Sequence, residues 1–507
     1  MATLSRRDFL NRLTALGLSA GTIPMLAGTA ALQSRSPLAT LRPIRIRGRV
    51  QAGQRGWGGV GLTDGISVVQ SDPEGYFELI SNSRRPFVYL SLPSGSQIPL
   101  NPTGTARFHQ PIQANRAGEM SVEFPLQRLN GSDEEHCFYQ LADPQTENLR
   151  DMKLFQSQTV PEIEKMAAAN PSGCQFGFAC GDIMFDDLEL YPEYEKGVRQ
   201  MNVPFFQVVG NHDLDRESPT NPGSSSTFQR HFGPAYYSFQ RGAVHYVVLN
   251  DVFWYGKNYL AYLDNEQLDW LAADLARVES GRTVIVALHI PAFSSQAQRR
   301  GISASPRLTL NNREALYRLL EPYQAHIVSG HTHESEHVFE GGCHEQVCGT
   351  VCGGWWSGPI CHDGTPNGYA VYRVRGEQVS WKYHSTGHKA SHQMRLYPPG
   401  ADPSAPDELV VNLWNWDPQW TVQWYEDGQR KGSMARRIGT DPLSEKLHRG
   451  EDLPLRHKWV EPVLTGHLFY APVSKQAREV RVEAKDRFGE MFSEVLQIQE
   501  RSFTQSR

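Results

Sequence analysis

Five short polar motifs contain the residue types that bind metal ions and transfer protons. In chain order they are Ala-Asp143-Pro-Gln145, Gly-Asp182, Gly-Asn211-His212, Leu-His289 and Gly-His331-Thr-His333. Asp and Asn oxygens mixed with imidazole nitrogens, without cysteine, suit Fe, Mn or Zn better than Ca or a soft metal. Six or seven donors are too many for one tetrahedral ion, so the set predicts two ions that share one carboxylate.

Each motif directly follows an apolar run of strand length. The runs cover residues 137–142, 176–180, 203–209, 284–288 and 326–328. Continuous apolar runs of this length are typical of strands buried on both faces, and open α/β sheets bind their ligands where such strands end. Between the runs, apolar residues recur at helical spacing in 149–170, 188–201, 265–277 and 312–323. Strands that alternate with helices predict a layered α/β fold.

Taken singly, each motif has an ordinary structural explanation. Gly-Asp and Gly-Asn-His are common turns, and His331-Thr-His333 alone could be a surface loop. Five such motifs in order, each after an apolar run, favour a metal site over five unrelated turns.

This constellation resembles the calcineurin-like metallophosphoesterases, whose pattern is Asp-x-His, Gly-Asp, Gly-Asn-His, a lone His and Gly-His-x-His. The resemblance covers residues 131–390. Gln145 departs from the usual histidine, as in the branch of the family written Ala-Asp-Pro-Gln, and an amide oxygen is a weaker, neutral ligand. The resemblance implies that one ion is bound by Asp143, Gln145, Asp182 and His333 and the other by Asp182, Asn211, His289 and His331, with Asp182 as the bridge.

The resemblance also implies the chemistry. Two cations about 3.5 to 4 Å apart lower the pKa of a shared water and hold the attacking and leaving oxygens of an in-line displacement. Phosphoester hydrolysis would then proceed by attack of the metal-bridged hydroxide, with His212 as the general acid. A carboxylate must orient His212, but Phe185 occupies the position that the family often gives to that Asp. Asp186 or Asp187 would take the role, and we favour Asp186.

The nature of the substrate stays open at this point. A small-molecule, lipid or glycan phosphoester is expected, and His212 favours a diester slightly, because an alkoxide leaving group needs a proton. One alternative is a periplasmic phosphomonoesterase, which would need cations such as Arg299, Arg300 or Arg307 for the dianionic phosphate. An alternative of another class is a non-catalytic envelope or glycan-binding protein with a vestigial metal site. The oligomeric state is not predicted.

The N-terminal segment, residues 1–40, resembles a twin-arginine export signal. Arg6-Arg7 precedes Phe9-Leu10 and a weakly apolar segment over 13–32. The export machinery would then be a partner and the periplasm the destination, with a membrane anchor if the signal is not cleaved. The alternative is a frayed N-terminal helix.

Two all-β domains are expected to flank the catalytic domain, which we place at 131–390. Residues 41–130 alternate apolar and polar side chains between turns, which predicts a small β-sandwich. It resembles transthyretin-like or carboxypeptidase-regulatory-like modules. Residues 391–501 alternate in the same way, and Asp427-Gly428 predicts a hairpin. This second segment resembles the C-terminal domain of a group of bacterial calcineurin-like phosphoesterases. The expected fold is therefore an α/β layered core, a β-sandwich flanked by helices, between two all-β domains.

The remaining features concern composition and the surroundings of the motifs. With 39% hydrophobic and 21% charged residues, the composition is that of a soluble globular protein, and a net charge of -5 does not favour nucleic acid as a partner. Polar loops over 215–231 and 293–308 are expected to shape a substrate pocket. Trp355 and Trp356 are either core residues or substrate contacts. One or two disulfides are expected among Cys343, Cys348, Cys352 and Cys361.

Overall fold

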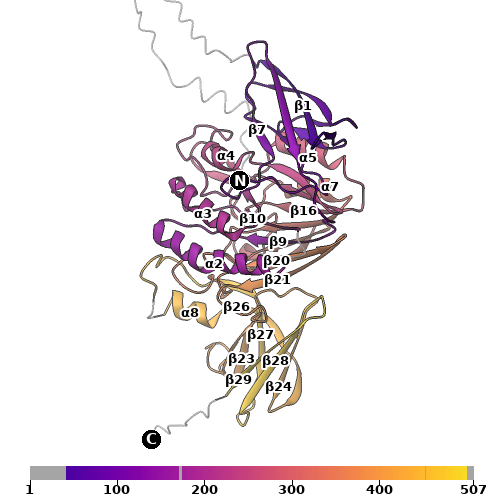
Figure 1. Ribbon diagram of the computed structural model, residues 1–507. Coiled ribbons are helices and arrows are strands. Elements are labelled where there is room, and N and C mark those ends of the chain that lie inside the picture. Colours follow the sequence, from indigo (N-terminus) through magenta and orange to yellow (C-terminus); the bar gives the residue numbers. More distant parts are fainter. Residues whose placement is uncertain (1–40, 171–173, 451–452, 499–507) are drawn as a thin grey trace, which may run out of the picture. The chain divides into compact units, whose positions relative to one another are not determined.

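The computed structural model describes residues 41–170, 174–450 and 453–498 (Figure 1). The described residues from Arg42 onward belong to one compact unit. The expected export signal lies outside the described residues. Within the described ranges, no helix combines the length and apolar character needed to cross a membrane.

The first two sheets form an all-β region. One sheet contains β1 (Pro43–Ala52), β2 (Arg55–Gly56), β5 (Tyr76–Asn82) and β8 (Glu119–Leu126), and the other contains β3 (Gly61–Thr63), β4 (Val68–Gln70), β6 (Phe87–Leu90) and β7 (His109–Pro111). In β1, Ile44 and Ile46 are buried while their neighbours are exposed, as expected when one face of a sheet meets a core. Side chains of both sheets share one apolar cluster.

Two larger sheets make the centre of the molecule. The first has the order β11-β10-β9-β20-β21, formed by Phe205–Val208, Cys174–Cys180, Glu135–Leu141, Gly368–Arg375 and Gln378–Ser385. The second has the order β12-β13-β16-β17-β19-β18, formed by Tyr237–Arg241, Val244–Val248, Thr283–Ala287, Gln324–Ser329, Cys343–Val347 and Glu336–Glu340. Strands β9, β10 and β11 are parallel, as are β13, β16, β17 and β19. Parallel strands place their carboxyl ends at one edge, where the polar motifs follow.

The two central sheets face each other across an aromatic core. Phe138 and Phe176 of the first sheet and Tyr246 of the second belong to one buried cluster, and Phe176 and Tyr246 lie 5.1 Å apart edge to face. Next to Phe138 in the chain, Tyr139 points the other way, into a cluster under the outer helices. Both faces of these strands are therefore apolar, which explains the continuous apolar runs in the sequence.

Helices cover the outer faces of both central sheets. Figure 1 shows α2 (Leu149–Ala169) and α3 (Tyr191–Met201) on one side and α5 (Asn265–Leu275) and α7 (Arg313–Leu320) on the other. These four helices confirm the helical predictions to within a few residues, and the order helix, sheet, sheet, helix confirms the layered core. A single 3-10 turn, η1 (Leu188–Leu190), precedes α3.

The two predicted polar loops are more ordered than expected. Helix α4 (Ser226–Phe232) ends the first, where Phe228 and Phe232 are buried, and α6 (Gln296–Arg299) lies within the second. A short hairpin of β14 (Val252–Trp254) and β15 (Tyr259–Ala261) lies between them in the chain. Phe228 and Phe232 lie four positions apart, and two apolar residues in a seven-residue helix are too short a pattern to predict it.

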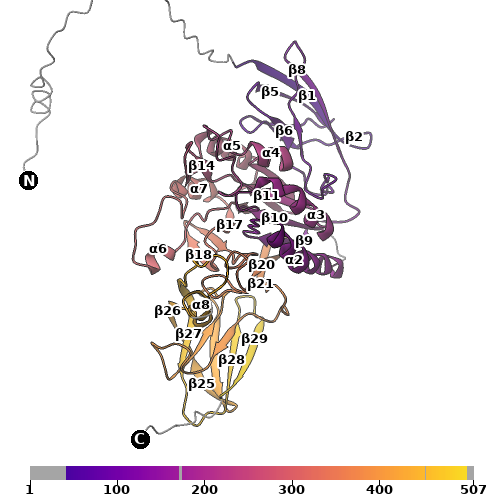
Figure 2. The same ribbon diagram turned by 90° about the vertical axis from the view of Figure 1, so that its left-hand side faces the viewer.

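The last part of the chain is again all-β apart from one short helix, α8 (Pro442–His448) (Figure 2). One sheet contains β22 (Arg395–Tyr397), β23 (Glu408–Asn412), β26 (Ala435–Thr440) and β27 (Leu464–Pro472), and the other contains β24 (Thr421–Glu426), β25 (Gln429–Ser433), β28 (Glu479–Lys485) and β29 (Met491–Gln497). Asp427 and Gly428 both have positive φ, 45° and 82°, and connect β24 to β25 as the predicted hairpin turn.

The expected disulfides are not formed, and that prediction is wrong for this structure. All seven cysteines carry free thiols. The sulfurs of Cys352 and Cys361 both lie next to the hydroxyl of Thr350, at 3.7 and 3.5 Å from its oxygen. Cys343 and Cys348 are buried in two different apolar clusters.

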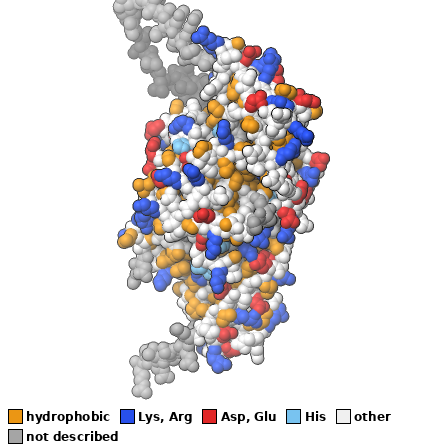
Figure 3. All heavy atoms as spheres, viewed as in Figure 1, with side chains coloured by type: hydrophobic (Ala, Val, Ile, Leu, Met, Phe, Trp, Pro, Cys, Tyr) orange, Lys and Arg blue, Asp and Glu red, His pale blue; other side chains and the backbone are white. Residues whose placement is uncertain are grey.

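On the face drawn in Figure 3, basic and acidic side chains are interspersed.

Candidate metal centre

The predicted donors lie just beyond the carboxyl ends of the parallel strands. Asp143 follows β9 and Asp182 follows β10 by two residues each, and Asn211 follows β11 by three. From the other sheet, His289 follows β16 and His331 follows β17, again by two residues. The two sheets therefore place all five motifs close together, although the motifs are spread over almost 200 residues of sequence.

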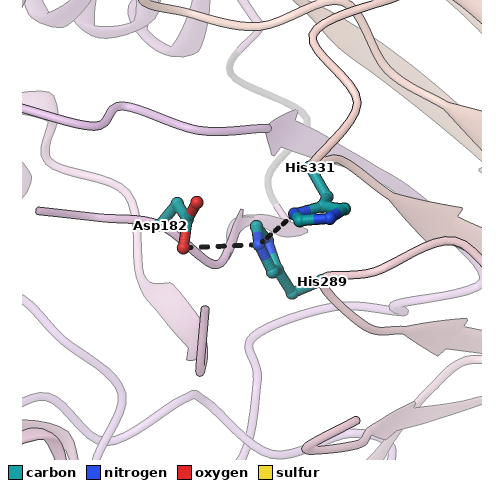
Figure 4. Close-up of side chains that lie close together, drawn as sticks. All are labelled: Asp182, His289 and His331. Carbon is teal, nitrogen blue, oxygen red and sulfur yellow. Dashed lines mark hydrogen bonds and ion pairs between the residues drawn. The ribbon is translucent and has the colours of Figure 1, made fainter. Parts of the chain in front are cut away.

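One group of donors surrounds the His289 imidazole. Its Nε2 lies 3.1 Å from Asn211 Oδ1, 3.3 Å from Asp182 Oδ1 and 3.2 Å from His331 Nδ1. Figure 4 shows Asp182, His289 and His331 pointing toward one another, and their ligand atoms all lie within 4.8 Å of each other. These four residues are the ones that the sequence resemblance assigns to the second ion.

A second group adjoins the first through Asp182. The Gln145 amide nitrogen lies 3.3 Å from Asp182 Oδ2, the oxygen that does not face His289. His333 Nε2 lies 3.5 Å from Asp143 Oδ1. The two oxygens of Asp182 thus face two different sets of donors.

The histidine rings are fixed by hydrogen bonds on their far sides. His289 Nδ1 lies 2.9 Å from the carbonyl oxygen of Cys180, and His333 Nδ1 lies 2.9 Å from that of Gly353. Each ring donates its Nδ1–H to a carbonyl, which leaves Nε2 directed at the centre. Metal-binding histidines are usually held in this way.

The backbone at the centre is strained. A positive φ is uncommon for residues other than glycine, and such strain concentrates at functional sites. Among the described residues, positive φ values occur at six predicted site positions, which are Asp143 (45°), Gln145 (37°), Asp182 (46°), Asp186 (71°), His331 (70°) and His333 (53°). The fold therefore holds these side chains in place at a cost in backbone energy.

The donors fit the two metal ions. Asp143 Oδ1 is buried and accepts no hydrogen bond from the described residues, so a carboxylate oxygen is left for a cation. Burial favours the neutral form of Asp182, but His289 and His212 outweigh burial and lower its pKa. Burial likewise disfavours the charged form of His289, yet the Asp182 carboxylate raises its pKa to about 10. The carboxylates of the centre thus stabilise positive charge between the donors.

His212 lies beside the donor groups. Its Nδ1 is 2.7 Å from Asp186 Oδ1, and its Nε2 is 4.0 Å from Asp182 Oδ2. The ring stacks on Phe185, with centroids 4.5 Å apart at 16°. The other candidate carboxylate, Asp187, instead accepts the backbone N–H of Glu189 at the start of η1. Of the two, only Asp186 contacts the imidazole.

Three further residues, to which the sequence assigned no role, support the centre. Arg216 contacts both Asp186 and His212, four positions after His212 in the chain. Buried Asp213 accepts N–H bonds from Ile183, Met184 and Gly210, which joins two motifs. Buried Asp251 accepts the N–H of His289. Asp213 directly follows Asn211-His212, and Asp251 follows the apolar run 244–249 and was expected near the rim of the site; these positions were the sequence signals available.

The arginines that the sequence suggested have different surroundings. Arg299 is buried in ion pairs with Glu334 and Glu336, so its use as a phosphate contact is wrong. Arg300 is exposed beyond the end of α6. The Arg307 guanidinium lies over the ring of Tyr259, and that ring contacts His331 edge to face. The backbone carbonyl oxygen of Arg307 accepts a hydrogen bond from His331 Nε2.

The two tryptophans have different surroundings. Trp355 is half-buried and stacks on His333, with centroids 3.9 Å apart at 13°. Trp356 is only 5% exposed, and its Nε1 donates to the carbonyl oxygen of Pro144. Trp356 therefore packs as a core residue that supports the first motif, whereas Trp355 faces the centre.

Comparison with known families matches three consecutive parts of the chain. Residues 140–335 match the calcineurin-like phosphoesterase family, 44–129 match the N-terminal region of calcineurin-like phosphoesterase, and 345–492 match its C-terminal region. The chain belongs to the calcineurin-like phosphoesterases. It is a metal-dependent hydrolase, and the family uses two metal ions. The alternative of a non-catalytic binding protein is not retained.

Individual relatives are more distant. The chain is 28% identical over 243 residues to serine/threonine-protein phosphatase CPPED1 of Bos taurus, which covers 45% of this chain and 72% of that protein. It is 32% identical over 145 residues to purple acid phosphatase 15 of Arabidopsis thaliana, 26% of this chain and only 25% of that protein. Among solved structures, a dimetal phosphatase from Danio rerio is 16% identical with a TM-score of 0.34, over 49% of this chain and 96% of that one.

Proposed function

We propose that this chain is an exported, binuclear-metal phosphoesterase that prefers phosphodiesters and uses His212 as its proton donor. The observation that carries the proposal is the position of Asp182. Its Oδ1 faces His289 Nε2 and its Oδ2 faces the Gln145 amide, each at 3.3 Å. One buried carboxylate therefore lies between two sets of donors, which is the arrangement that a bridged pair of ions needs.

The proposed ligands follow from these two sets. Asp143, Gln145, Asp182 and His333 would hold one Fe, Mn or Zn ion, and Asp182, Asn211, His289 and His331 would hold the other. When bound, the ions supply Lewis acidity and activate water at neutral pH. Because the Gln145 amide nitrogen now faces Asp182, the amide would turn to present its oxygen to the ion.

His212 is placed to donate a proton to the leaving oxygen. Its Nδ1 is engaged by Asp186, which leaves Nε2 to face the centre. Burial lowers the pKa of His212, but Asp182 and Asp186 raise it more, and the net pKa lies above its ordinary 6.5. The ring would therefore carry a proton before the reaction and hand it over as the bond to the alcohol breaks.

Phosphomonoester hydrolysis is the second candidate, and Arg216 is the observation that favours it. A terminal phosphate dianion usually binds an arginine. Arg216 is half exposed beside Asp186 and His212, and Arg307 lies on the His331 side. The Bos taurus relative, a serine/threonine-protein phosphatase by name, supports the same candidate.

Export to the periplasm is proposed from sequence alone. Arg6-Arg7 and the weakly apolar segment after them support it. Small-molecule, lipid and glycan phosphoesters are all accessible in that compartment.

Turnover of one aryl monoester and one aryl diester tests the proposal. We expect kcat/KM to be higher for the diester, activity to vanish after chelation, and Mn, Fe or Zn to restore it. A higher kcat/KM for the monoester would favour the second candidate. Equal activity before and after chelation would contradict the metal-dependent mechanism.

A further inference from the structure

Residues 455–460, which we name the rim segment, lie in the chain between α8 and β27 and expose apolar surface. Leu455 is 95% exposed and Trp459 is 57% exposed. Each side chain leaves apolar area in water that burial would stabilise.

Ion pairs hold the rim segment against the start of α2, close in sequence to the first metal-binding motif. Arg456 forms ion pairs with Glu147 and Asp151, at 2.7 Å in the case of Asp151. Both acids lie at the start of α2, directly after the motif that contains Gln145. Asp151 is buried, with a side chain only 1% exposed, and Arg456 and Arg150 together provide the charge that a buried carboxylate requires. Its neighbour His457 lies 3.8 Å from Glu147 as well.

Aromatic contacts connect the rim segment to two predicted site residues. Trp459 meets Trp355 at 4.5 Å, and Trp355 stacks on His333. His457 meets Phe185 at 6.3 Å, and Phe185 stacks on His212. Trp355 has a positive φ of 55° and His457 one of 52°, so both side chains are held by strained backbone. A continuous aromatic surface therefore leads from the centre to the exposed face of Trp459.

The side of the centre that this surface occupies indicates what binds there. His212 is the proposed proton donor to the leaving oxygen, and the aromatic surface begins at the ring stacked on it. An alcohol protonated by His212 would therefore leave next to this surface. Arg216, which contacts Asp186 and His212, and Arg307, whose carbonyl oxygen accepts from His331, belong to other loops and not to the rim segment.

We propose that the rim segment contacts the substrate and gives specificity for phosphoesters whose leaving alcohol carries an apolar group, either an aromatic ring or an alkyl chain. The inference rests on the proposed function, which supplies the reaction and the role of His212. It adds a substrate class to that function. Trp459 and Leu455 would pack against the apolar part of the alcohol while the phosphoryl group lies between the metal ligands. Flat aromatic side chains bind such groups without losing much side-chain freedom.

Kinetics on three esters that differ only in the alcohol test this proposal. Methyl, octyl and naphthylmethyl esters of one phosphoryl group share an alkoxide leaving group, so only the apolar part changes. In Trp459→Ala, we expect the kcat/KM ratios of octyl to methyl and of naphthylmethyl to methyl to fall about tenfold, mainly through KM. Trp459→Leu should restore the octyl ratio but not the naphthylmethyl ratio if the ring is what binds an aromatic alcohol. Tyr76→Ala, which removes a comparably exposed aromatic side chain from β5, should leave both ratios unchanged.

A binding measurement separates this inference from the proposed function. Calorimetry on the metal-loaded protein should show octylphosphonate binding more tightly than methylphosphonate, with the difference lost in Trp459→Ala. If the protein binds the phosphonates in this way but hydrolyses none of the three esters, the proposed function is wrong and the contact of the rim segment with apolar groups is supported. If it hydrolyses the esters and Trp459→Ala changes neither the kcat/KM ratios nor the binding difference, the proposed role of the rim segment is wrong and the proposed function is retained.

Discussion

The residues at the metal centre combine chemical suitability with an unusual backbone. Asp182, His331 and His333 are donors that the sequence identified by type and spacing, and all three have positive φ. Asp, Asn and His tolerate this conformation better than most residues. Residue type therefore predicts the donors, but no sequence pattern shows that the backbone is strained to aim them.

Support around the donors was harder to predict than the donors themselves. Phe185 stands where the family often has an acid, yet it stacks on His212 and Asp186 makes the hydrogen bond. The sequence favoured Asp186 over Asp187 by position alone. The local backbone conformation decides which of the two neighbouring carboxylates reaches the His212 ring, and the sequence does not show that conformation. Arg216 had no motif to identify it.

Replacing His212 by Ala tests its role as the proton donor. An ordinary alkoxide leaves slowly without a proton, so we expect kcat to fall by about 10² to 10⁴ for alkyl esters. An aryl ester with an acidic phenol should slow far less. Metal content, measured by elemental analysis, should not change. Equal losses on both ester types, or a parallel loss of metal, would assign His212 to binding instead.

At the scale of elements, the central strands and helices follow from apolar patterning. Strands buried on both faces appear as continuous apolar runs, and β9, β10, β16 and β17 are found where those runs are. The parallel order then brings their carboxyl ends together. Helices α4 and α6 were missed because each has too few turns for a periodic pattern.

Glycines allow the motif loops to approach one another. A Cβ at Gly210 would lie 1.9 Å from the Asp182 backbone nitrogen, and one at Gly330 would lie 2.4 Å from Asp143 Oδ2. Only hydrogen fits in either place. The Gly-Asn-His and Gly-His-x-His motifs therefore need glycine for packing against a neighbouring motif.

At the scale of the whole molecule, long-range contacts place the C-terminal part at the site. Arg456 pairs with Asp151, which lies 305 residues away in the chain. The sequence predicted an all-β segment there but gave no sign that it reaches the metal centre, since charge pairs between distant loops leave no local pattern. Residues 345–492 match one family region that also includes β20 and β21, so the catalytic sheet itself depends on this part of the chain.

Export is a prediction about the whole protein. If Arg6-Arg7 directs the folded chain to the twin-arginine pathway, replacing both by lysine should leave folded, metal-loaded protein in the cytoplasm. Cell fractionation with immunodetection measures the distribution. Lysine keeps the positive charge, so a loss of export would reflect the arginine pair itself. Unchanged periplasmic levels would remove the twin-arginine interpretation.

The central claim is that two metal ions share Asp182, and counting metals per chain tests it most directly. After reconstitution with Mn, Fe or Zn, elemental analysis of the purified protein should find close to two ions per chain. His331→Ala and His333→Ala should each lose about one of them, whereas Asp182→Asn should lose more than either because it contacts both donor groups. One ion or none in the wild-type protein, or an Asp182→Asn variant that keeps both, would contradict the account.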